Sequence, residues 1–252
     1  MIHFVGAGPG APDLITLRGA ELLRRAGMIV YAGSLVNPQL LELAPQGCEI
    51  YDSASMTLEQ VLEKLAAGEK KGVVTVRLHT GDPSIYGAVR EQMDRLEKLG
   101  IAYEVVPGVS SFCAAAAAAK AEYTLPSVSQ TLIITRMEGR TPVPEREKLS
   151  LLARHRASMA LFLSSGLLKE TCAALTGEDC YSPDTKAVVV YKASWPEEKI
   201  LRGTIGTIAA QAEAAGIRNT ALVLVGDFLG DAYELSKLYD ASFSHAFRKA
   251  SK

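Results

Sequence analysis

Short apolar runs alternate with helical patterns through the first half of this chain, and no other feature of the sequence restricts the fold as strongly. Five such runs, rich in β-branched and other apolar residues, have the length of buried strands. The patterns between them have helix signals: a capping box at Thr57 and Gln60, and terminating glycines at Gly27 and Gly100. This alternation predicts a parallel sheet with helices on its faces. The expected strands cover residues 2–5, 28–31, 48–51, 73–79 and 103–106.

The pattern is interrupted at Leu125-Pro126-Ser127, and a second, smaller set of strands and helices follows. We therefore predict an N-terminal α/β domain over residues 1–124, a C-terminal α/β domain over 125–232 and a tail over 233–252. In the second domain the expected strands cover 131–135, 160–163, 187–191, 221–225 and a short stretch near Ile200. The expected helices there cover 167–175 and 207–215.

The strand at 73–79 runs directly into Thr80-Gly81-Asp82-Pro83, which places this turn at the carboxyl end of a strand. Ligands of open α/β sheets bind at that edge. Taken alone, the turn is explained at least as well by a tight connection, with glycine for positive φ and proline to end the strand. Two more loops of the same kind, 6–13 and 107–111, follow other strands, and the three together favour a ligand site.

The first of these loops also satisfies the GxGxxA pattern of dinucleotide-binding proteins, through Gly6, Gly8 and Ala11. Pro9 and Pro12 remove backbone N–H groups where a pyrophosphate would need donors. The second strand ends in Ala32-Gly33-Ser34, without the acidic residue that holds a ribose. We therefore disfavour a nicotinamide-dependent oxidoreductase, although a loop that admits a ligand close to the backbone remains expected.

Charge and composition exclude several other classes of function. The net charge of the 252-residue chain is −1, so no basic field predicts a nucleic-acid partner. It has no apolar run of about 18 residues that would predict a membrane span, and its N-terminus enters a strand without a signal-type segment. The four cysteines and four histidines are dispersed, which predicts neither a metal site nor a disulfide framework. A cytoplasmic protein is the expected result.

The loop after the first strand of the second domain is locally basic. Residues 136–156 carry six lysines and arginines against three glutamates, in a chain that is otherwise nearly neutral. Most such runs are solvated helix faces, but arginine forks also suit the carboxylates of a polyanionic small substrate. Trp195, the only tryptophan, lies in another loop at a strand end, where it could cover an apolar ligand or close a core edge.

Four of the loops, in order and at plausible spacing, resemble those of the tetrapyrrole (corrin/porphyrin) methyltransferases. These are Val5-Gly6-Ala7-Gly8-Pro9-Gly10-Ala11-Pro12-Asp13-Leu14, Thr80-Gly81-Asp82-Pro83, Val106-Pro107-Gly108-Val109-Ser110-Ser111, and Leu224-Val225-Gly226 after Thr220-Ala221. Each motif alone is weak, whereas the ordered set is specific and covers nearly the whole chain. Tyr31-Ala32-Gly33-Ser34-Leu35-Val36, Thr135 to Glu145, Leu161-Phe162-Leu163-Ser164-Ser165 and Val188 to Pro196 narrow the likeness to members that methylate carbon 11 of precorrin-4 or cobalt-precorrin-4 in cobalamin biosynthesis.

The resemblance implies two α/β domains, each a mostly parallel sheet flanked by helices, with S-adenosylmethionine bound in the cleft between them and S-adenosylhomocysteine as product. It also implies a homodimer and a small tetrapyrrole substrate. Matched by motif, the cofactor-binding residues would be Pro9, Thr80, Gly81, Asp82, Ile85, Ser110, Ser111, Leu163, Ser164 and Ala221. Many members of the family carry Tyr-Met where this chain has Leu163-Ser164. This difference leaves the role of the pair in cofactor binding open.

The resemblance assigns no general base, so the catalytic residues stay unknown, with Asp82, Arg136 and Arg140 as candidates. The two arginines would hold substrate carboxylates, and Asp82 would either orient a ligand or only shape its turn. Methylation at another position of a corrin or porphyrin precursor is the alternative activity, and a non-catalytic binding protein is a third possibility. Whether the substrate carries cobalt is left open, because the metal would belong to the substrate.

Overall fold

The computed structural model describes residues 1–250, so Ser251 and Lys252 of the expected tail lie outside the described part. The chain forms two compact units. The first contains Met1–Ala114 together with Ala193–Pro196, and the second contains Ala115–Lys192 and Glu197–Lys252. The division falls within helix α4 (Ser111–Ala119), and a domain boundary at residue 125 stays a prediction. No helix of the described residues is long and apolar enough to cross a membrane.

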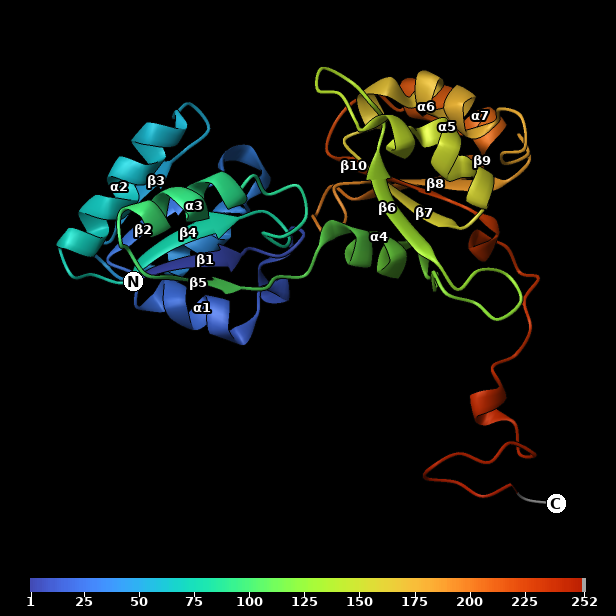
Figure 1. Cartoon of the computed structure of the whole chain (residues 1–252), viewed down its shortest axis with the longest axis horizontal. Helices are drawn as coiled ribbons and strands as arrows, with labels where there is room; N and C mark the ends of the chain where they lie inside the picture. Colours follow the sequence, from blue (N-terminus) through green and yellow to red (C-terminus); the bar gives the residue numbers. More distant parts are fainter. Residues whose placement is uncertain (251–252) are drawn as a thin grey trace. The chain divides into compact units, whose positions relative to one another are not determined.

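The first unit is a five-stranded parallel sheet in the order β3-β2-β4-β1-β5, as the alternating pattern predicts (Figure 1). Its strands are β1 (Ile2–Gly6), β2 (Met28–Tyr31), β3 (Glu49–Asp52), β4 (Thr75–His79) and β5 (Tyr103–Val106). Its complete helices are α1 (Leu17–Arg24), α2 (Leu58–Lys70) and α3 (Arg90–Lys98). The capping box expected at Thr57 and Gln60 is confirmed at the start of α2.

The helices of the first unit cover opposite faces of its sheet. Leu23 of α1 packs in one core cluster with Val5 and Leu78, whereas α2 and α3 contribute Leu65 and Leu96 to a cluster on the other face. The loop after β1 therefore leads to one face, and the loop after the neighbouring strand β4 leads to the other. Such a reversal between adjacent strands is the topological switch point at which α/β sheets bind ligands.

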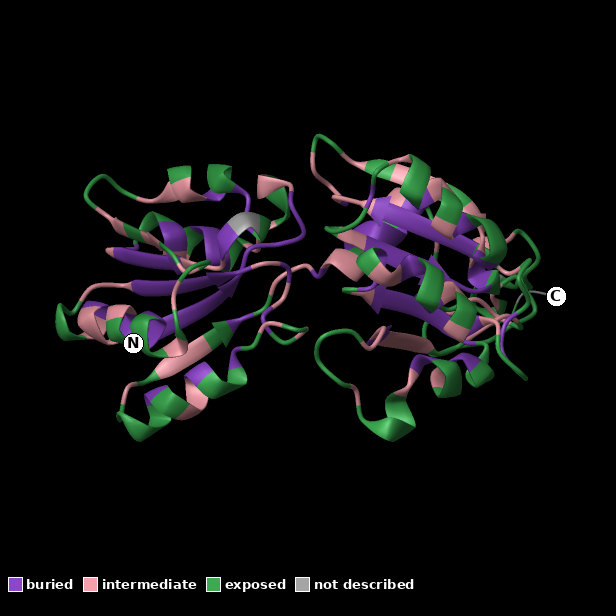
Figure 2. Ribbon diagram, turned by 90° about the horizontal axis from the view of Figure 1, so that it is seen from above, coloured by how far each residue is buried: buried purple, intermediate pink, exposed green. Residues whose placement is uncertain are grey.

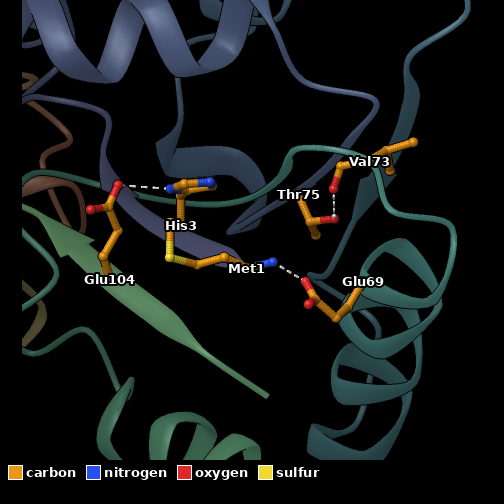
Figure 3. Close-up of polar contacts among 6 residues, drawn as sticks. All are labelled: Met1, His3, Glu69, Val73, Thr75 and Glu104. Atoms are coloured by element: carbon orange, nitrogen blue, oxygen red, sulfur yellow. Dashed lines mark hydrogen bonds and ion pairs between the residues drawn. The ribbon is translucent and has the colours of Figure 1, made fainter.

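Polar contacts fasten the opposite, amino-terminal edge of this sheet (Figure 3). His3 Nδ1 lies 2.8 Å from Glu104 Oε1, and the Thr75 hydroxyl donates to the Val73 carbonyl at 3.2 Å. The amino group of Met1 forms an ion pair with Glu69. The predicted site residues of this unit all lie toward the other edge.

The second unit contains a five-stranded sheet in the order β6-β7-β10-β8-β9. Its strands are β6 (Leu132–Arg136), β7 (Ser158–Phe162), β8 (Lys186–Tyr191), β9 (Lys199–Thr204) and β10 (Ala221–Val225), and its helices are α5 (Leu149–Leu152), α6 (Leu168–Leu175) and α7 (Ile205–Ala214). One large apolar cluster joins these helices to the sheet. The inner strands of both sheets are buried, while the helices are buried mainly on the side facing the sheet (Figure 2).

Both α/β units are thus confirmed, but the expectation of a mostly parallel second sheet needs correction. Only β6 and β7 pair in parallel, and the other three pairings are antiparallel. The physical reason lies in the connections. Seven residues separate β8 from β9, which is too short for the helical crossover that a parallel pair requires. A further consequence is that β10 begins at the edge where β6, β7 and β8 end.

Candidate functional site

Three glycine loops meet at the carboxyl edge of the first sheet, at its switch point. Gly8 and Gly81 form an isolated bridge, with Gly81 N donating to Gly8 O at 2.8 Å. A Cβ atom on Gly6 would lie 2.5 Å from Gly108 Cα, and one on Gly108 would lie 2.2 Å from Gly81 O. The loops after β1, β4 and β5 therefore approach one another so closely that only glycine fits. The result is a tightly packed junction of backbone from three loops at this edge.

Asp82 joins two of these loops through its carboxylate. Oδ2 accepts from Gly108 N–H at 2.8 Å, while Oδ1 accepts from Ser84 N–H at 2.8 Å and from the Ser84 hydroxyl. Partial burial alone would raise the pKa of Asp82, but these hydrogen bonds outweigh it and hold the pKa below its usual value. The carboxylate is therefore ionised at neutral pH and already occupied by its own loop, which favours a structural role over proton transfer.

Among residues 1–250, Thr80 and His79 each carry a buried side-chain atom for which the structure shows no hydrogen-bond partner. These atoms are Thr80 Oγ1 and His79 Nε2, at the carboxyl end of β4. Burial, with a smaller contribution from the Arg77 charge, lowers the pKa of His79 to about 3, so its imidazole is neutral at pH 7. A buried hydroxyl without a partner is costly. Thr80 Oγ1 is thus a polar atom at this edge that a ligand could satisfy, and the prediction that Thr80 lines the cofactor site stays a prediction.

The loop after β1 is covered by the segment Ala193–Pro196 of the same unit. Trp195 Nε1 donates to Pro9 O at 3.0 Å, and Ala11 N–H donates to Ser194 Oγ at 3.0 Å. A Cβ atom on Gly10 would lie 2.1 Å from Trp195 Cδ1. The indole therefore packs directly on the backbone of this loop, so Trp195 closes a core edge here, one of the two roles considered for it.

The other predicted residues of the first unit lie in the two adjoining loops. Ile85 follows Asp82 and its N–H donates to Asp82 O at 3.2 Å. Ser110 is 6% exposed and precedes α4, and its carbonyl accepts the first bond of the helix from Cys113 at 3.0 Å. The structure thus gathers on one edge the following predicted residues: Pro9, Thr80, Gly81, Asp82, Ile85, Ser110 and Ser111.

The predicted residues of the second unit gather at one edge of the second sheet. Leu163, directly after β7, is 69% exposed and has a left-handed backbone with φ 51°. Ser164 is fully buried: its hydroxyl accepts from Met137 N–H at 2.8 Å and donates to Phe162 O at 2.7 Å, which ties the ends of β6 and β7 together. Ala221 begins β10 at this edge, opposite Tyr191. The Leu163 side chain is therefore apolar and accessible at this edge.

The two candidate arginines differ in their surroundings. The Arg136 guanidinium donates to Pro142 O at 2.8 Å, to Thr141 O at 3.1 Å and to Met137 O at 3.4 Å, so it holds its own loop closed. Arg140 lies in that loop and is exposed. Arg140 is therefore the better placed of the two to meet a carboxylate from solution.

Within residues 1–250 no group of three or more His, Cys, Asp and Glu side chains could hold a metal ion. For a sulfonium cofactor, the residues present do fit. The edge of the first sheet carries the Thr80 hydroxyl, which has no hydrogen-bond partner among residues 1–250. It lacks the run of free N–H donors with which phosphate loops bind anions, since prolines interrupt its first loop.

Known proteins similar to this chain include methyltransferases, which agrees with a site for a sulfonium cofactor. A curated cobalt-precorrin-4 C(11)-methyltransferase of Methanocaldococcus jannaschii is 51% identical over all of this chain and 97% of its own length. A precorrin-4 C(11)-methyltransferase of Pseudomonas aeruginosa is 45% identical, with 98% of each chain covered. The crystal structure of a cobalamin biosynthetic enzyme, cobalt precorrin-4 methyltransferase, superposes with a TM-score of 0.89 at 47% identity, covering 91% of this chain and 96% of that one.

The family model of the tetrapyrrole (corrin/porphyrin) methylases matches residues 1–209. That match includes every predicted cofactor residue except Ala221. With most of the chain matched, and with full-length relatives far above 30% identity, the resemblance seen in the four loops is confirmed. The chain belongs to the tetrapyrrole (corrin/porphyrin) methylase family.

Proposed function

We propose that this chain transfers the methyl group of S-adenosylmethionine to carbon 11 of precorrin-4 or cobalt-precorrin-4, in cobalamin biosynthesis. The observation that carries the proposal is the 51% identity, over the whole chain, to a cobalt-precorrin-4 C(11)-methyltransferase. The switch point at the carboxyl edge of the first sheet supports it, because α/β sheets bind their ligands there. The proposed cofactor residues are the set predicted from the resemblance.

When bound, S-adenosylmethionine supplies a methyl group on a positively charged sulfur. The chain's own part is to align this methyl with a nucleophilic ring carbon and to exclude water, which can lower the barrier by several kcal/mol. The Thr80 hydroxyl, which has no partner among residues 1–250, would hydrogen-bond the cofactor at the carboxyl end of β4. Asp82 keeps the loops after β4 and β5 in place, and Leu163 offers an apolar surface.

Ligand binding gives the first test. In a thermal unfolding experiment, S-adenosylhomocysteine should raise the midpoint, since a ligand at a hundredfold excess over its Kd stabilises the native state by about 2.7 kcal/mol. NAD serves as the comparison, because the missing ribose acid disfavours a nicotinamide cofactor. Stabilisation by NAD alone would refute the proposal and favour an oxidoreductase.

Transfer itself gives the second test. We expect isotope-labelled S-adenosylmethionine to deliver one methyl group to precorrin-4 or to its cobalt complex, at carbon 11 by NMR of the product. Labelling at another carbon, or only of an earlier tetrapyrrole, would establish the alternative activity within the family. Comparing the metal-free and cobalt substrates would decide which of the two routes the chain serves.

Reversing the charge of Arg140 should weaken substrate binding selectively. In Arg140→Glu the exposed guanidinium becomes a carboxylate that repels the acetate and propionate groups of a tetrapyrrole. We expect KM for the macrocycle to rise about tenfold, which corresponds to about 1.4 kcal/mol, with the Kd of S-adenosylhomocysteine unchanged. Steady-state kinetics and equilibrium titration measure the two quantities.

The matched control is Arg146→Glu, which makes the same charge change at another exposed position of this basic loop. Equal effects of both variants on KM would show that the overall positive charge of the loop, and not Arg140 itself, attracts the substrate. Arg136→Glu is less selective, because it also breaks the three bonds that close the loop. An unchanged KM in both Arg136→Glu and Arg140→Glu would exclude these arginines from substrate binding.

We further propose that the active protein is a homodimer in the cytoplasm, as the resemblance implies. Light scattering behind size-exclusion chromatography would measure the mass of the assembly. A single-chain mass at working concentration would contradict the dimer, and recovery of the native protein in a membrane or secreted fraction would contradict the location.

A further inference from the structure

Arg77 is a buried cation whose hydrogen-bond partners are neutral. It lies in the middle of β4 and is 5% exposed. Nε donates to Gln92 Oε1 at 3.0 Å, and Nη1 donates to Val30 O at 3.2 Å. Burial lowers the pKa of Arg77 to about 10, which still leaves it charged at neutral pH. A charge inside a sheet is costly unless it is well bonded, so its partners are strongly constrained.

Gln92 links the buried Arg77 to the loop before α3. It lies in the first turn of α3 and is 6% exposed. Because arginine can only donate, the oxygen of the Gln92 amide must face Arg77. The amide nitrogen then faces Ala88 and donates to its carbonyl at 3.0 Å. A continuous path of hydrogen bonds thus runs from the backbone of β2, through Arg77 and Gln92, to Ala88.

Ala88 ends the loop that follows Asp82, and this loop is held in an unusual conformation. Tyr86 and Ala88 have left-handed backbones, with φ of 54° and 49°. A Cβ atom on Gly87 would lie 2.2 Å from Pro83 O, so the chain is also tightly turned. Residues other than glycine keep such conformations only where their surroundings impose them.

We infer that Arg77 and Gln92 are positioning residues that fix the loop from Asp82 to Ala88. Neither side chain needs to touch a ligand. Their buried amide–guanidinium contact sets the place of the Ala88 carbonyl, and this in turn sets the course of the loop. The loop carries Asp82 and Ile85, two of the predicted cofactor contacts, so the consequence for cofactor affinity rests on the proposed function.

The variant Gln92→Glu separates loop positioning from folding. A glutamate keeps an acceptor for Arg77 and adds an opposite charge, so the buried cation stays paired. It removes the donor to Ala88 and places an acceptor oxygen against that carbonyl. We expect an unfolding midpoint no lower than that of the parent, faster amide hydrogen exchange confined to residues 84–88, and a Kd for S-adenosylhomocysteine raised about tenfold or more.

The control is Glu91→Gln, the reverse change at the neighbouring exposed position of α3. It should alter none of the three quantities. A second variant tests the inference if Gln92→Glu fails to fold. Arg77→Met combined with Gln92→Leu replaces both polar side chains by apolar ones, and proteins often tolerate such a replacement of a buried polar pair. It should show the same fast exchange in the loop and the same loss of affinity.

Wild-type amide exchange in residues 84–88 for both variants would overturn the inference, whatever their stability. So would an unchanged Kd in variants whose loop exchanges faster, because the loop would then not position the ligand. Failure of the parent protein to bind S-adenosylhomocysteine would instead refute the proposed function. The exchange measurement would still test the hydrogen-bond path in that case, so the two failures are distinguishable.

Discussion

Gly108→Ala is expected to abolish detectable S-adenosylhomocysteine binding and to destabilise the protein by about 1–3 kcal/mol, the usual range for overpacking. The added methyl would lie 2.2 Å from Gly81 O and 2.7 Å from Gly6 Cα. Both neighbours are backbone, and no side chain can move aside to make room. The three loops at the switch point would therefore separate. Isothermal titration and chemical denaturation measure the two effects.

Gly177→Ala is the matched control for this substitution. Its new methyl would meet only Cys180 Sγ, at 3.8 Å, which is ordinary van der Waals contact. We expect it to change neither the free energy of unfolding nor ligand affinity. If Gly108→Ala behaved like this control, the close approach of the three loops would be wrong.

Asp82→Ala is expected to cost about 1–3 kcal/mol of stability, because Gly108 N–H and the two Ser84 donors lose a charged acceptor. Ligand affinity should fall as well, since the loops after β4 and β5 lose their connection. Asp94→Ala, which removes an exposed ion pair with Arg90, is the control and should change little. A variant of normal stability that fails only to bind ligand would show that the carboxylate contacts the ligand itself.

The same contacts predict a pH dependence with a definite sign. The folded pKa of Asp82 lies below its usual value of 3.8. Its carboxylate therefore contributes stability that is fully present above that value and is lost as the pH falls through the lower folded pKa. Asp82→Asn should accordingly show a constant stability deficit between about pH 5 and 8, which shrinks in more acidic solution. A deficit that grew on acidification would contradict the assignment.

Periodicity and capping signals predicted most of the elements correctly. The strand expected at 221–225 is observed as Ala221–Val225, and the helix expected at 167–175 as Leu168–Leu175. These features are local, so a single sequence contains them. The direction of β10 is not local, because it depends on which strands become its neighbours, and the second sheet was therefore expected to be more parallel than it is.

In the candidate site, too, some features could be predicted from the sequence and others could not. Loops at the ends of parallel strands must share an edge, so the gathering of Thr80, Gly81 and Ser110 could be predicted. The hydrogen bonds of the Asp82 and Arg136 side chains to their own loops could not be predicted, because the sequence does not indicate which backbone groups a side chain will meet. Arg77 and Gln92 were missed for a different reason. An arginine inside an otherwise apolar strand was a visible signal, but its meaning required the position of α3.

Trp195 lies on Pro9 and Gly10, although 184 residues separate it from Gly10 along the chain, and this has a consequence for biosynthesis. During translation, the N-terminal sheet can assemble as soon as β5 leaves the ribosome. Its first glycine loop, however, stays bare until Pro196 has emerged, after most of the polypeptide has been made. A nascent or truncated chain ending at Ala114 would thus carry all five strands of that sheet and still lack the segment that covers the loop after β1.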